Sequence, residues 1–202
     1  MKKVILASAS PRRKELLSEA CSEFKILTAP TDETLPEGVH PREGVAILAE
    51  RKGEAVWRAY DEAHDAYIIS SDTLVEADGV PLGKPKDAED ARRMLRMLSG
   101  RAHNVHTGIA LRLGDRVVSG VATTAVIFRE LGDSEIDEYI ASGDPMDKAG
   151  SYGIQSGGGK FVSGFLGDYD TVVGFSMNLL ARLAEEIGAL DILDKRGDEK
   201  NG

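Results

Sequence analysis

Residues 4–17 read VILASASPRRKELL, and this stretch predicts how the fold begins. The apolar run Val4–Leu6 is typical of a buried strand, and the small residues after it indicate a tight turn. Ser10 then stands as a natural N-cap, with Pro11 at the first helical position. The stretch therefore predicts a strand, a turn and a helix in direct succession.

Three cations, Arg12, Arg13 and Lys14, stand in the first turn of this helix. The helix dipole favours acidic residues there, by roughly 0.3–1 kcal/mol each, and opposes basic ones. The cations make sense if an anion shares the site, because free backbone N–H groups and guanidinium forks together bind phosphates. A solvated basic turn is the alternative, and this segment alone does not decide between the two.

Composition limits the class of protein. The 202 residues are 42% hydrophobic and 29% charged, which favours one ordinary globular domain. A formal net charge of −9 argues against a surface for non-specific binding to nucleic acid or anionic membranes. Cys21 is the only cysteine, so no internal disulfide is possible and a reducing compartment is expected. No apolar run is long enough for a signal core or a membrane span, so we expect a cytoplasmic protein.

Hydrophobic periodicity predicts alternating strands and helices along the rest of the chain. Helices are expected at about 41–60, 87–98, 133–142 and 174–187, and strands at 24–27, 66–69, 74–76, 80–82, 104–113, 116–129 and 160–166. The hairpins in this order require antiparallel pairs, so the fold class is α/β with a mixed sheet. Without repeats or linkers, residues 1–193 are expected to form one domain, followed by a charged, disordered tail at 194–202.

Asp72 follows the expected central strand at 66–69. Ligands in α/β sheets bind outside the carboxyl ends of strands, so Asp72 is expected where catalytic groups belong. Lys52 lies on the apolar face of the helix at 41–60, where a lysine either reaches the rim or pairs with a buried anion.

Together these groups suit a phosphate-bearing substrate. The candidates are Arg12, Arg13, Lys52, Asp72, Lys84 and, on the first long loop, Glu33. Several cations with one or two carboxylates fit a polyphosphate that carries a divalent metal. A carboxylate that the metal does not consume can deprotonate water for in-line attack.

Competing motifs are weak. The chain has no Gly-x-x-x-x-Gly-Lys-Ser/Thr motif, and no Gly-x-Gly-x-x-Gly follows its first strand. The glycines at 157–159 favour a flexible loop over a phosphate cradle. His103 and His106 face opposite sides of a strand and make a poor metal pair. Tyr152 and Phe161 are expected to pack in the core, with stacking on a base as the alternative.

Five motifs in a fixed order run along nearly the whole chain. They are LASASPRRKELL at residues 6–17, SDTLV at 71–75, GKP at 83–85, LSGRAHNVHTG at 98–108 and KAGSYGIQ at 148–155. With these motifs the chain resembles the Maf (septum-formation) family of nucleoside triphosphate pyrophosphatases. The resemblance implies an elongated mixed sheet flanked by helices, in two lobes around a substrate cleft. It also implies hydrolysis at the α–β bond to nucleoside monophosphate and pyrophosphate with Mg²⁺ or Mn²⁺, in the house-cleaning of nucleotide pools, and a possible homodimer.

The resemblance assigns roles to single residues. Asp72 matches the proton acceptor, and it forms the expected metal site together with the acidic residue Glu33. The phosphate-contacting positions correspond here to Ser8, Arg13, Lys52 and Lys84. The positions that track substrate preference correspond to Arg12, Thr73 and Gln155.

The specificity trio resembles the branch that acts on dTTP and UTP. The branch that acts on 7-methyl-GTP usually has an aromatic residue in place of Arg12. The Gln155 amide can both donate and accept, which suits the edge of thymine or uracil.

The chain also departs from the family pattern. Residues 171–176 read TVVGFS where Asn-Val-Val-Gly-Leu-Pro is usual, and Ser156 stands where glycine is common. Two alternative functions stay open, a nucleotide-binding regulator of septum formation with little turnover and a 7-methyl-GTP pyrophosphatase.

Overall fold

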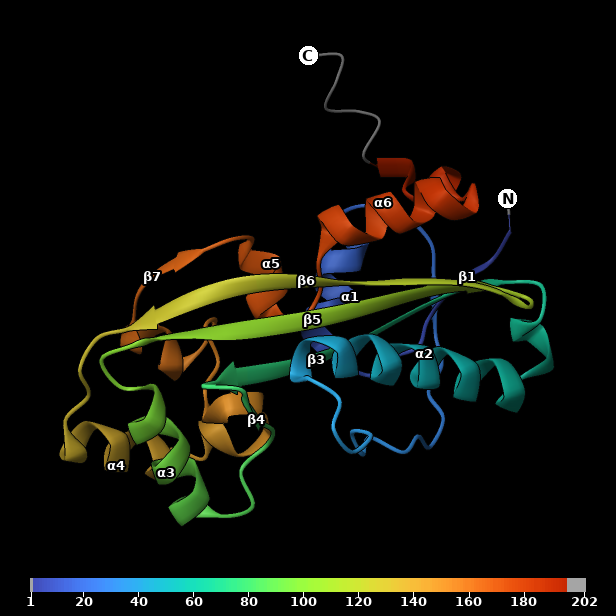
Figure 1. Ribbon diagram of the computed structural model, residues 1–202. Helices are drawn as coiled ribbons and strands as arrows, with labels where there is room; N and C mark the ends of the chain where they lie inside the picture. The colour runs from blue at the N-terminus through green and yellow to red at the C-terminus, as the bar shows by residue number, and fades with distance from the viewer. Residues whose placement is uncertain (1, 196–202) are drawn as a thin grey trace, which may run out of the picture.

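A seven-stranded mixed sheet runs through the protein in a computed structural model that describes residues 2–195 (Figure 1). The strands are β1 (Val4–Leu6), β2 (Lys25–Ile26), β3 (Tyr67–Ala77), β4 (Val80–Leu82), β5 (Ala102–Leu113), β6 (Arg116–Phe128) and β7 (Val162–Leu166). Their order is β2-β1-β3-β5-β6-β7, with β4 paired to β3 outside this path. β1 is parallel to β2 and β3, and the other pairs are antiparallel, which confirms the expected mixed α/β class.

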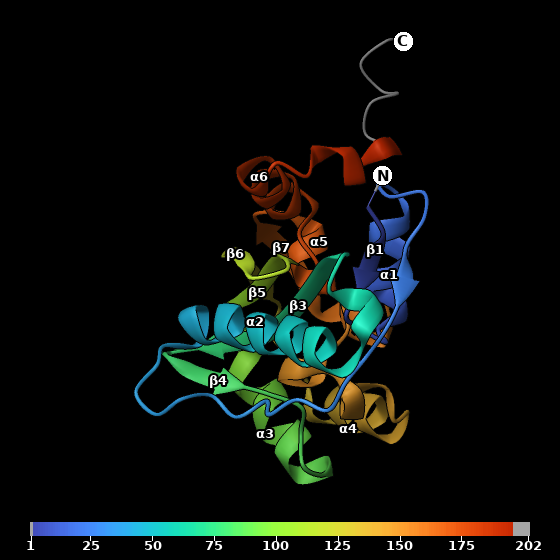
Figure 2. The ribbon, with the colours of Figure 1, turned by 90° about the vertical axis from the view of Figure 1, so that its right-hand side faces the viewer.

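Helices cover both faces of the sheet. They are α1 (Pro11–Ser18), α2 (Pro41–Ala59), α3 (Ala88–Leu98), α4 (Asp133–Ala141), α5 (Tyr169–Val173) and α6 (Met177–Ile187). α2 lies across one face and α6 across the other, while α3 and α4 gather at the far end of the long strands (Figure 1). The loop that precedes α2 runs alongside this helix (Figure 2). None of the helices within residues 2–195 combines the length and apolarity needed to cross a membrane.

The hydrophobic core of the described residues falls into separate clusters, as expected for a fold with two lobes. One cluster joins α1 and α6 to the sheet around Leu17 and Phe175, and a smaller one lies under α2 around Val56 and Ile68. A third cluster sits at the α3–α4 end around Phe128. The two lobes are therefore stabilised by separate apolar clusters, connected through β3, β5 and β6.

Gly108 explains how closely α2 approaches the sheet. A Cβ atom on Gly108 of β5 would lie 2.3 Å from the carbonyl oxygen of Val45 and 2.5 Å from its carbonyl carbon. Real Cβ atoms do not come so near to backbone, so only glycine lets the helix pack at this distance. Ser70 of β3 adds a hydrogen bond from its Oγ to the carbonyl oxygen of Ala49, 2.6 Å away. These contacts fix α2, and with it Lys52, against the strand that carries Asp72.

The expectation that the central strand ends before Asp72 is wrong. β3 continues to Ala77 because β5 pairs with it over its whole length, down to Glu76 opposite Asn104. On the other side β1 stops at Leu6, opposite Ile69, and β4 pairs with β3 only from Val75 onward, which leaves residues 70–74 of β3 without a strand neighbour on that edge. Asp72 therefore lies beyond the carboxyl end of β1, in the middle of β3.

Three further boundaries differ from the prediction. The helix expected at 133–142 has its N-cap at Gly132 and ends at Ala141. Residues 157–161 form a 3-10 turn, so β7 begins at Val162 and the predicted flexible loop is wrong. The helix expected at 174–187 begins only at Met177 as α6, and an unpredicted short helix, α5, precedes it and ends at Gly174, whose φ of 112° is in the left-handed region that ends a helix.

The start of the expected tail is hydrogen-bonded to the body of the protein. The backbone N–H of Ser22 donates to Asp194 at 2.8 Å, and the Lys195 ammonium donates to the carbonyl oxygen of Ser18 at 2.7 Å. Residues 196–202 of that tail lie outside the described residues.

Candidate active site

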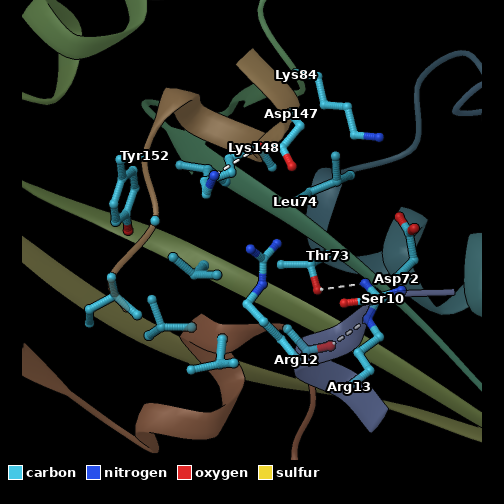
Figure 3. Close-up of a pocket in the computed structure, with 18 of the residues that line it drawn as sticks. Ser10, Arg12, Arg13, Asp72, Thr73, Leu74, Lys84, Asp147, Lys148 and Tyr152 are labelled. Atoms are coloured by element: carbon cyan, nitrogen blue, oxygen red, sulfur yellow. Dashed lines mark hydrogen bonds and ion pairs between the residues drawn. The ribbon is translucent and has the colours of Figure 1, made fainter. Parts of the chain in front are cut away.

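A cavity of about 720 Å³ lies between the two lobes and brings the predicted residues together. Its lining includes the start of α1, the inner face of α2, the middle of β3, and the loops at 83–84 and 147–156 (Figure 3). Eight of the nine predicted site residues line it, namely Arg12, Arg13, Glu33, Lys52, Asp72, Thr73, Lys84 and Gln155. Ser8 lies beneath the lining and accepts a hydrogen bond from Arg13 at 3.3 Å. A volume of this size is typical of a small-molecule site.

Lys52 joins the two carboxylates of the site. Its ammonium is 2.8 Å from Oε1 of Glu33 and also contacts Oδ1 of Asp72, which is only 8% exposed. Of the two possibilities for a lysine on the apolar face of α2, pairing with a buried anion is therefore the one observed. The Lys52 ammonium is the main cause that holds the pKa of Glu33 below its usual range, with smaller contributions from Lys84 and Arg13. Glu33 is therefore ionised at neutral pH.

Arg13 is largely occupied by the protein itself. Its Nε donates to the carbonyl oxygen of Gly174 at 2.9 Å, and Nη1 donates to the carbonyl oxygen of Ser71 at 2.9 Å. Nη1 also donates to Ser8, and Nη2 donates to Thr73 Oγ1 at 3.3 Å. Burial lowers the pKa of Arg13, and the charge of Asp72 opposes that shift. Since a guanidinium has five N–H groups, one is left for a ligand, and the main effect of Arg13 is to hold α1, β3 and the α5–α6 junction together.

Arg12 and Lys84 are the cations available to a ligand. Neither side chain makes a hydrogen bond or ion pair with another residue between 2 and 195. The Arg12 guanidinium extends into the space between Thr73 and Lys148 (Figure 3). The position of the two arginines in the helix does not separate them, and only the resemblance gave them different roles. In the structure, Arg13 is bound by acceptors of the protein and Arg12 is left to the cavity.

The lining of the cavity also has an apolar part. It includes the side chains of Val75, Val105, Ala149, Ile154 and Val172. Thr73 and Gln155 stand among them, and Thr73 Oγ1 is 3.0 Å from Thr107 Oγ1. Gln155 is exposed, and its side chain makes no hydrogen bond to another residue in the described part of the chain. The cavity thus fits a ligand with an anionic end and a flat, mostly apolar end with a polar edge.

Sequence reasoning missed two charged residues that line this cavity. Lys148 donates to Asp147 at 2.8 Å and to Asp144 at 3.1 Å, and both Asp147 and Lys148 face the cavity (Figure 3). Lys148 opens the KAGSYGIQ motif, which was the available signal. Asp147 offers none, because a lone acid in a loop is usually solvated.

Tyr152, Phe161 and Gly158 are all buried. Tyr152 is 5% exposed and meets Phe128 edge to face, so core packing is confirmed, although its surface also lines the cavity. Phe161 is fully buried. Gly158 packs against Tyr152, where a Cβ would come within 2.8 Å of the ring-bearing carbon, so this turn is no open phosphate cradle.

The two histidines are separate, as predicted. His103 Nε2 is 2.8 Å from Tyr152 Oη, whereas His106 Nδ1 is 2.8 Å from Thr123 Oγ1. Within residues 2–195, no group of three or more His, Cys, Asp or Glu side chains is arranged to hold a metal ion. A divalent metal at Asp72 and Glu33 therefore needs further oxygen ligands from a substrate.

His103 should make the stability of the protein depend on pH. Burial lowers its pKa to about 4 in the folded state, from the ordinary 6.5. Below pH 6.5 the unfolded chain therefore binds a proton that the folded protein refuses, so stability falls as the pH drops toward 4. We expect a contribution of about 3 kcal/mol to the free energy of unfolding, lost over that interval.

Urea unfolding at pH 7, 6, 5 and 4.5 measures this effect. The variant His103→Phe, which keeps a ring among Phe128 and Tyr152, should lose stability less steeply with falling pH than the wild type. Parallel pH profiles for the two proteins would exclude His103 as the cause.

Comparison with known proteins agrees with this geometry. A family model described as "Maf-like protein" matches residues 3–187. A protein of Bacillus cytotoxicus named "dTTP/UTP pyrophosphatase" is 45% identical over 95% of this chain and 97% of its own. A protein of the same name from Geobacillus sp. is 45% identical over 93% of this chain and 100% of its own.

One solved structure has a similar fold. The Ham1 protein of Staphylococcus aureus superposes with a TM-score of 0.50 at 15% identity, covering 99% of this chain and 100% of its own. That likeness supports the sheet architecture alone. From the family match over residues 3–187 and the close relatives, the chain belongs to the family of Maf-like proteins.

Proposed function

We propose that this protein is a nucleoside triphosphate pyrophosphatase that acts on dTTP and UTP. It cleaves the α–β phosphoanhydride bond and releases nucleoside monophosphate and pyrophosphate. The observation that carries the proposal is one cavity with a buried carboxylate, two unpaired cations and an apolar part. The relatives named "dTTP/UTP pyrophosphatase" support it, since they match over nearly the full length of both chains.

Asp72 is the general base of the proposed reaction. One of its carboxylate oxygens is held by Lys52, and the other accepts no hydrogen bond from a residue between 2 and 195. That free oxygen is available to take a proton from a water molecule that attacks the α-phosphorus. Lys52, pinned by Glu33 as well, keeps the carboxylate oriented toward the cavity.

Arg12, Lys84 and the remaining N–H of Arg13 stabilise the departing pyrophosphate. Negative charge grows on that group as the bond breaks, so fixed cations lower the energy of the transition state more than that of the bound substrate. A single well-placed donor of this kind contributes roughly 3–4 kcal/mol. Because Arg12 and Lys84 have no competing partner within residues 2–195, their charge is available for this purpose.

Asp72 and Glu33 together suit a divalent cation such as Mg²⁺ or Mn²⁺. Both are carboxylates that share Lys52, and hard cations prefer oxygen ligands from one or two carboxylates and substrate phosphates. Such an ion would neutralise phosphate charge and polarise the bond to be cleaved.

The apolar part of the cavity receives the base. A pyrimidine ring fits against the valines there, and the Gln155 amide can satisfy the donor and the acceptor on the edge of thymine or uracil. Arg12 takes the place of the aromatic residue expected for 7-methyl-GTP. We infer a house-cleaning role in cytoplasmic nucleotide pools. The homodimer and the lack of a nucleic-acid partner stay predictions.

A substrate panel tests this function. The purified protein is incubated with UTP, dTTP, CTP or 7-methyl-GTP, each with Mg²⁺, with Mn²⁺ or with excess EDTA, and monophosphate and pyrophosphate are quantified. We expect UTP and dTTP to react at least about tenfold faster than the other two, and EDTA to abolish turnover.

Other products would contradict the proposal in distinct ways. Orthophosphate in place of pyrophosphate would exclude attack at the α-phosphorus. Tight nucleotide binding without any product would favour the regulator of septum formation instead.

A further inference from the structure

Asp144 is the centre of a hydrogen-bonded cluster at the edge of the cavity. Its Oδ2 accepts from Tyr139 Oη and from Ser156 Oγ, both at 2.7 Å. Its Oδ1 accepts from Lys148 at 3.1 Å, and Lys148 donates to its backbone carbonyl oxygen at 2.6 Å. We call Asp144, Tyr139, Lys148 and Ser156 the Asp144 cluster.

The Asp144 cluster is hydrogen-bonded to both ends of the loop that carries Gln155. At the near end, the backbone N–H of Gly153 donates to Tyr139 Oη at 3.3 Å. At the far end, Ser156 is held through its hydroxyl, and its backbone N–H closes a turn to the carbonyl oxygen of Gly153 at 3.2 Å. The turn is tight, because a Cβ on Gly153 would lie 2.5 Å from Ser156 Oγ and 2.7 Å from Lys148 Cε.

Low exposure and the charge of Asp144 strengthen the hydrogen bonds of the Asp144 cluster. Side-chain exposure is 25% for Asp144 and 11% for Lys148, and Tyr139 is buried. Burial alone would raise the pKa of Asp144, but the hydrogen bonds from Tyr139, Ser156 and Lys148 outweigh it and hold that pKa below its usual range. The carboxylate is thus ionised at neutral pH, and bonds to a charged acceptor are the stronger kind.

The direction of the Gln155 side chain depends on the Asp144 cluster. Its side chain has no hydrogen-bond partner within residues 2–195, so its direction follows from the backbone between Gly153 and Ser156.

We propose that Ser156 and Asp144 are positioning residues for base recognition, which orient Gln155 toward the pyrimidine edge. The inference rests on the proposed function, in which Gln155 reads the base. It concerns selectivity and leaves the chemical step to the phosphate end of the cavity.

The test is the ratio of kcat/KM for UTP to that for CTP. Ser156→Ala should raise KM for UTP about tenfold and leave kcat within about twofold of the wild-type value. The ratio of kcat/KM for UTP to that for CTP should therefore also fall about tenfold. Ser156→Thr, which keeps the hydroxyl, should retain the wild-type ratio. Ser163→Ala is the matched control, because this hydroxyl on β7 donates to the carbonyl oxygen of Ile127 on β6, and Ser163 does not line the cavity.

Gln155→Ala separates positioning from a merely structural role. If Ser156 acts through Gln155, the double variant Gln155→Ala/Ser156→Ala should show the ratio of Gln155→Ala alone. A wild-type ratio in Ser156→Ala, or an equal loss for all nucleotides, would overturn the inference while leaving the proposed function intact. No pyrophosphate from the wild type with any nucleotide would overturn both.

Discussion

Replacing Asp72 with asparagine should lower the rate of pyrophosphate release by at least about 100-fold while the protein stays folded. Asparagine has the shape of aspartate but cannot take a proton from water at neutral pH. Lys52 keeps its bond to Glu33 at 2.8 Å, so the substitution leaves no unpaired buried charge. The measurement is kcat with UTP and Mg²⁺, with circular dichroism and a melting curve to show that the fold persists.

Asp32→Asn provides the control for this experiment. Asp32 is the carboxylate next to Glu33, but it lies outside the cavity lining and accepts a hydrogen bond from the backbone N–H of Thr34 at 2.9 Å. Its variant should react at nearly the wild-type rate. If Asp72→Asn also stayed within threefold of the wild type, Asp72 would not be the base.

Gly108→Ala should destabilise the protein by about 3 kcal/mol. The new methyl group would overlap the backbone of Val45, 2.3 Å from its oxygen, and neither the helix nor the central strand can yield cheaply. α2 would have to move away from β5, and Lys52 would move with it. We therefore expect a lower rate of hydrolysis in addition to a lower free energy of unfolding, measured by urea titration.

Gly164→Ala is the matched substitution in a strand with room for it. Gly164 of β7 has no atom within 4 Å of the position that its Cβ would occupy. Its variant should change stability by less than about 0.5 kcal/mol. Equal stabilities for the Gly108 and Gly164 variants would mean that α2 adapts freely, against the packing described above.

Local signals predicted much of the fold. The helix expected at 87–98 is capped by Asp87, which accepts a 2.8 Å hydrogen bond from the backbone N–H of Asp90, and the expected hairpin of β3 and β4 turns at Asp78 and Gly79. These features depend on residues only a few positions apart. The length of β3 could not be predicted in the same way, because its second half is kept extended by pairing with β5, from Asp72 opposite Gly108 to Glu76 opposite Asn104.

The site was also predictable in part. The residue types and the five motifs were enough to select eight residues that line one cavity. They could not show that the protein itself occupies Arg13 and leaves Arg12 free for a ligand, since both stand at the start of the same helix. The acceptors that occupy Arg13 come from Ser71 and from Gly174, which is 161 positions away. Lys148 and Asp144 were missed for a different reason, because their partners are near in sequence but are brought together by loops without periodicity.

The sequence by itself determined the kinds of groups available and the local elements that carry them, because caps, turns and apolar spacing act over a few residues. The tertiary structure alone decided which groups are free to bind a ligand. Hydrogen bonds and charges act over a few ångströms in space, so the partners of Lys52 and Arg13 depend on how distant segments pack. For this physical reason Lys52 pairs with both Glu33 and Asp72, and Arg13 is bound by acceptors of the protein. Arg12 has no such partner within residues 2–195 and is free to bind a ligand.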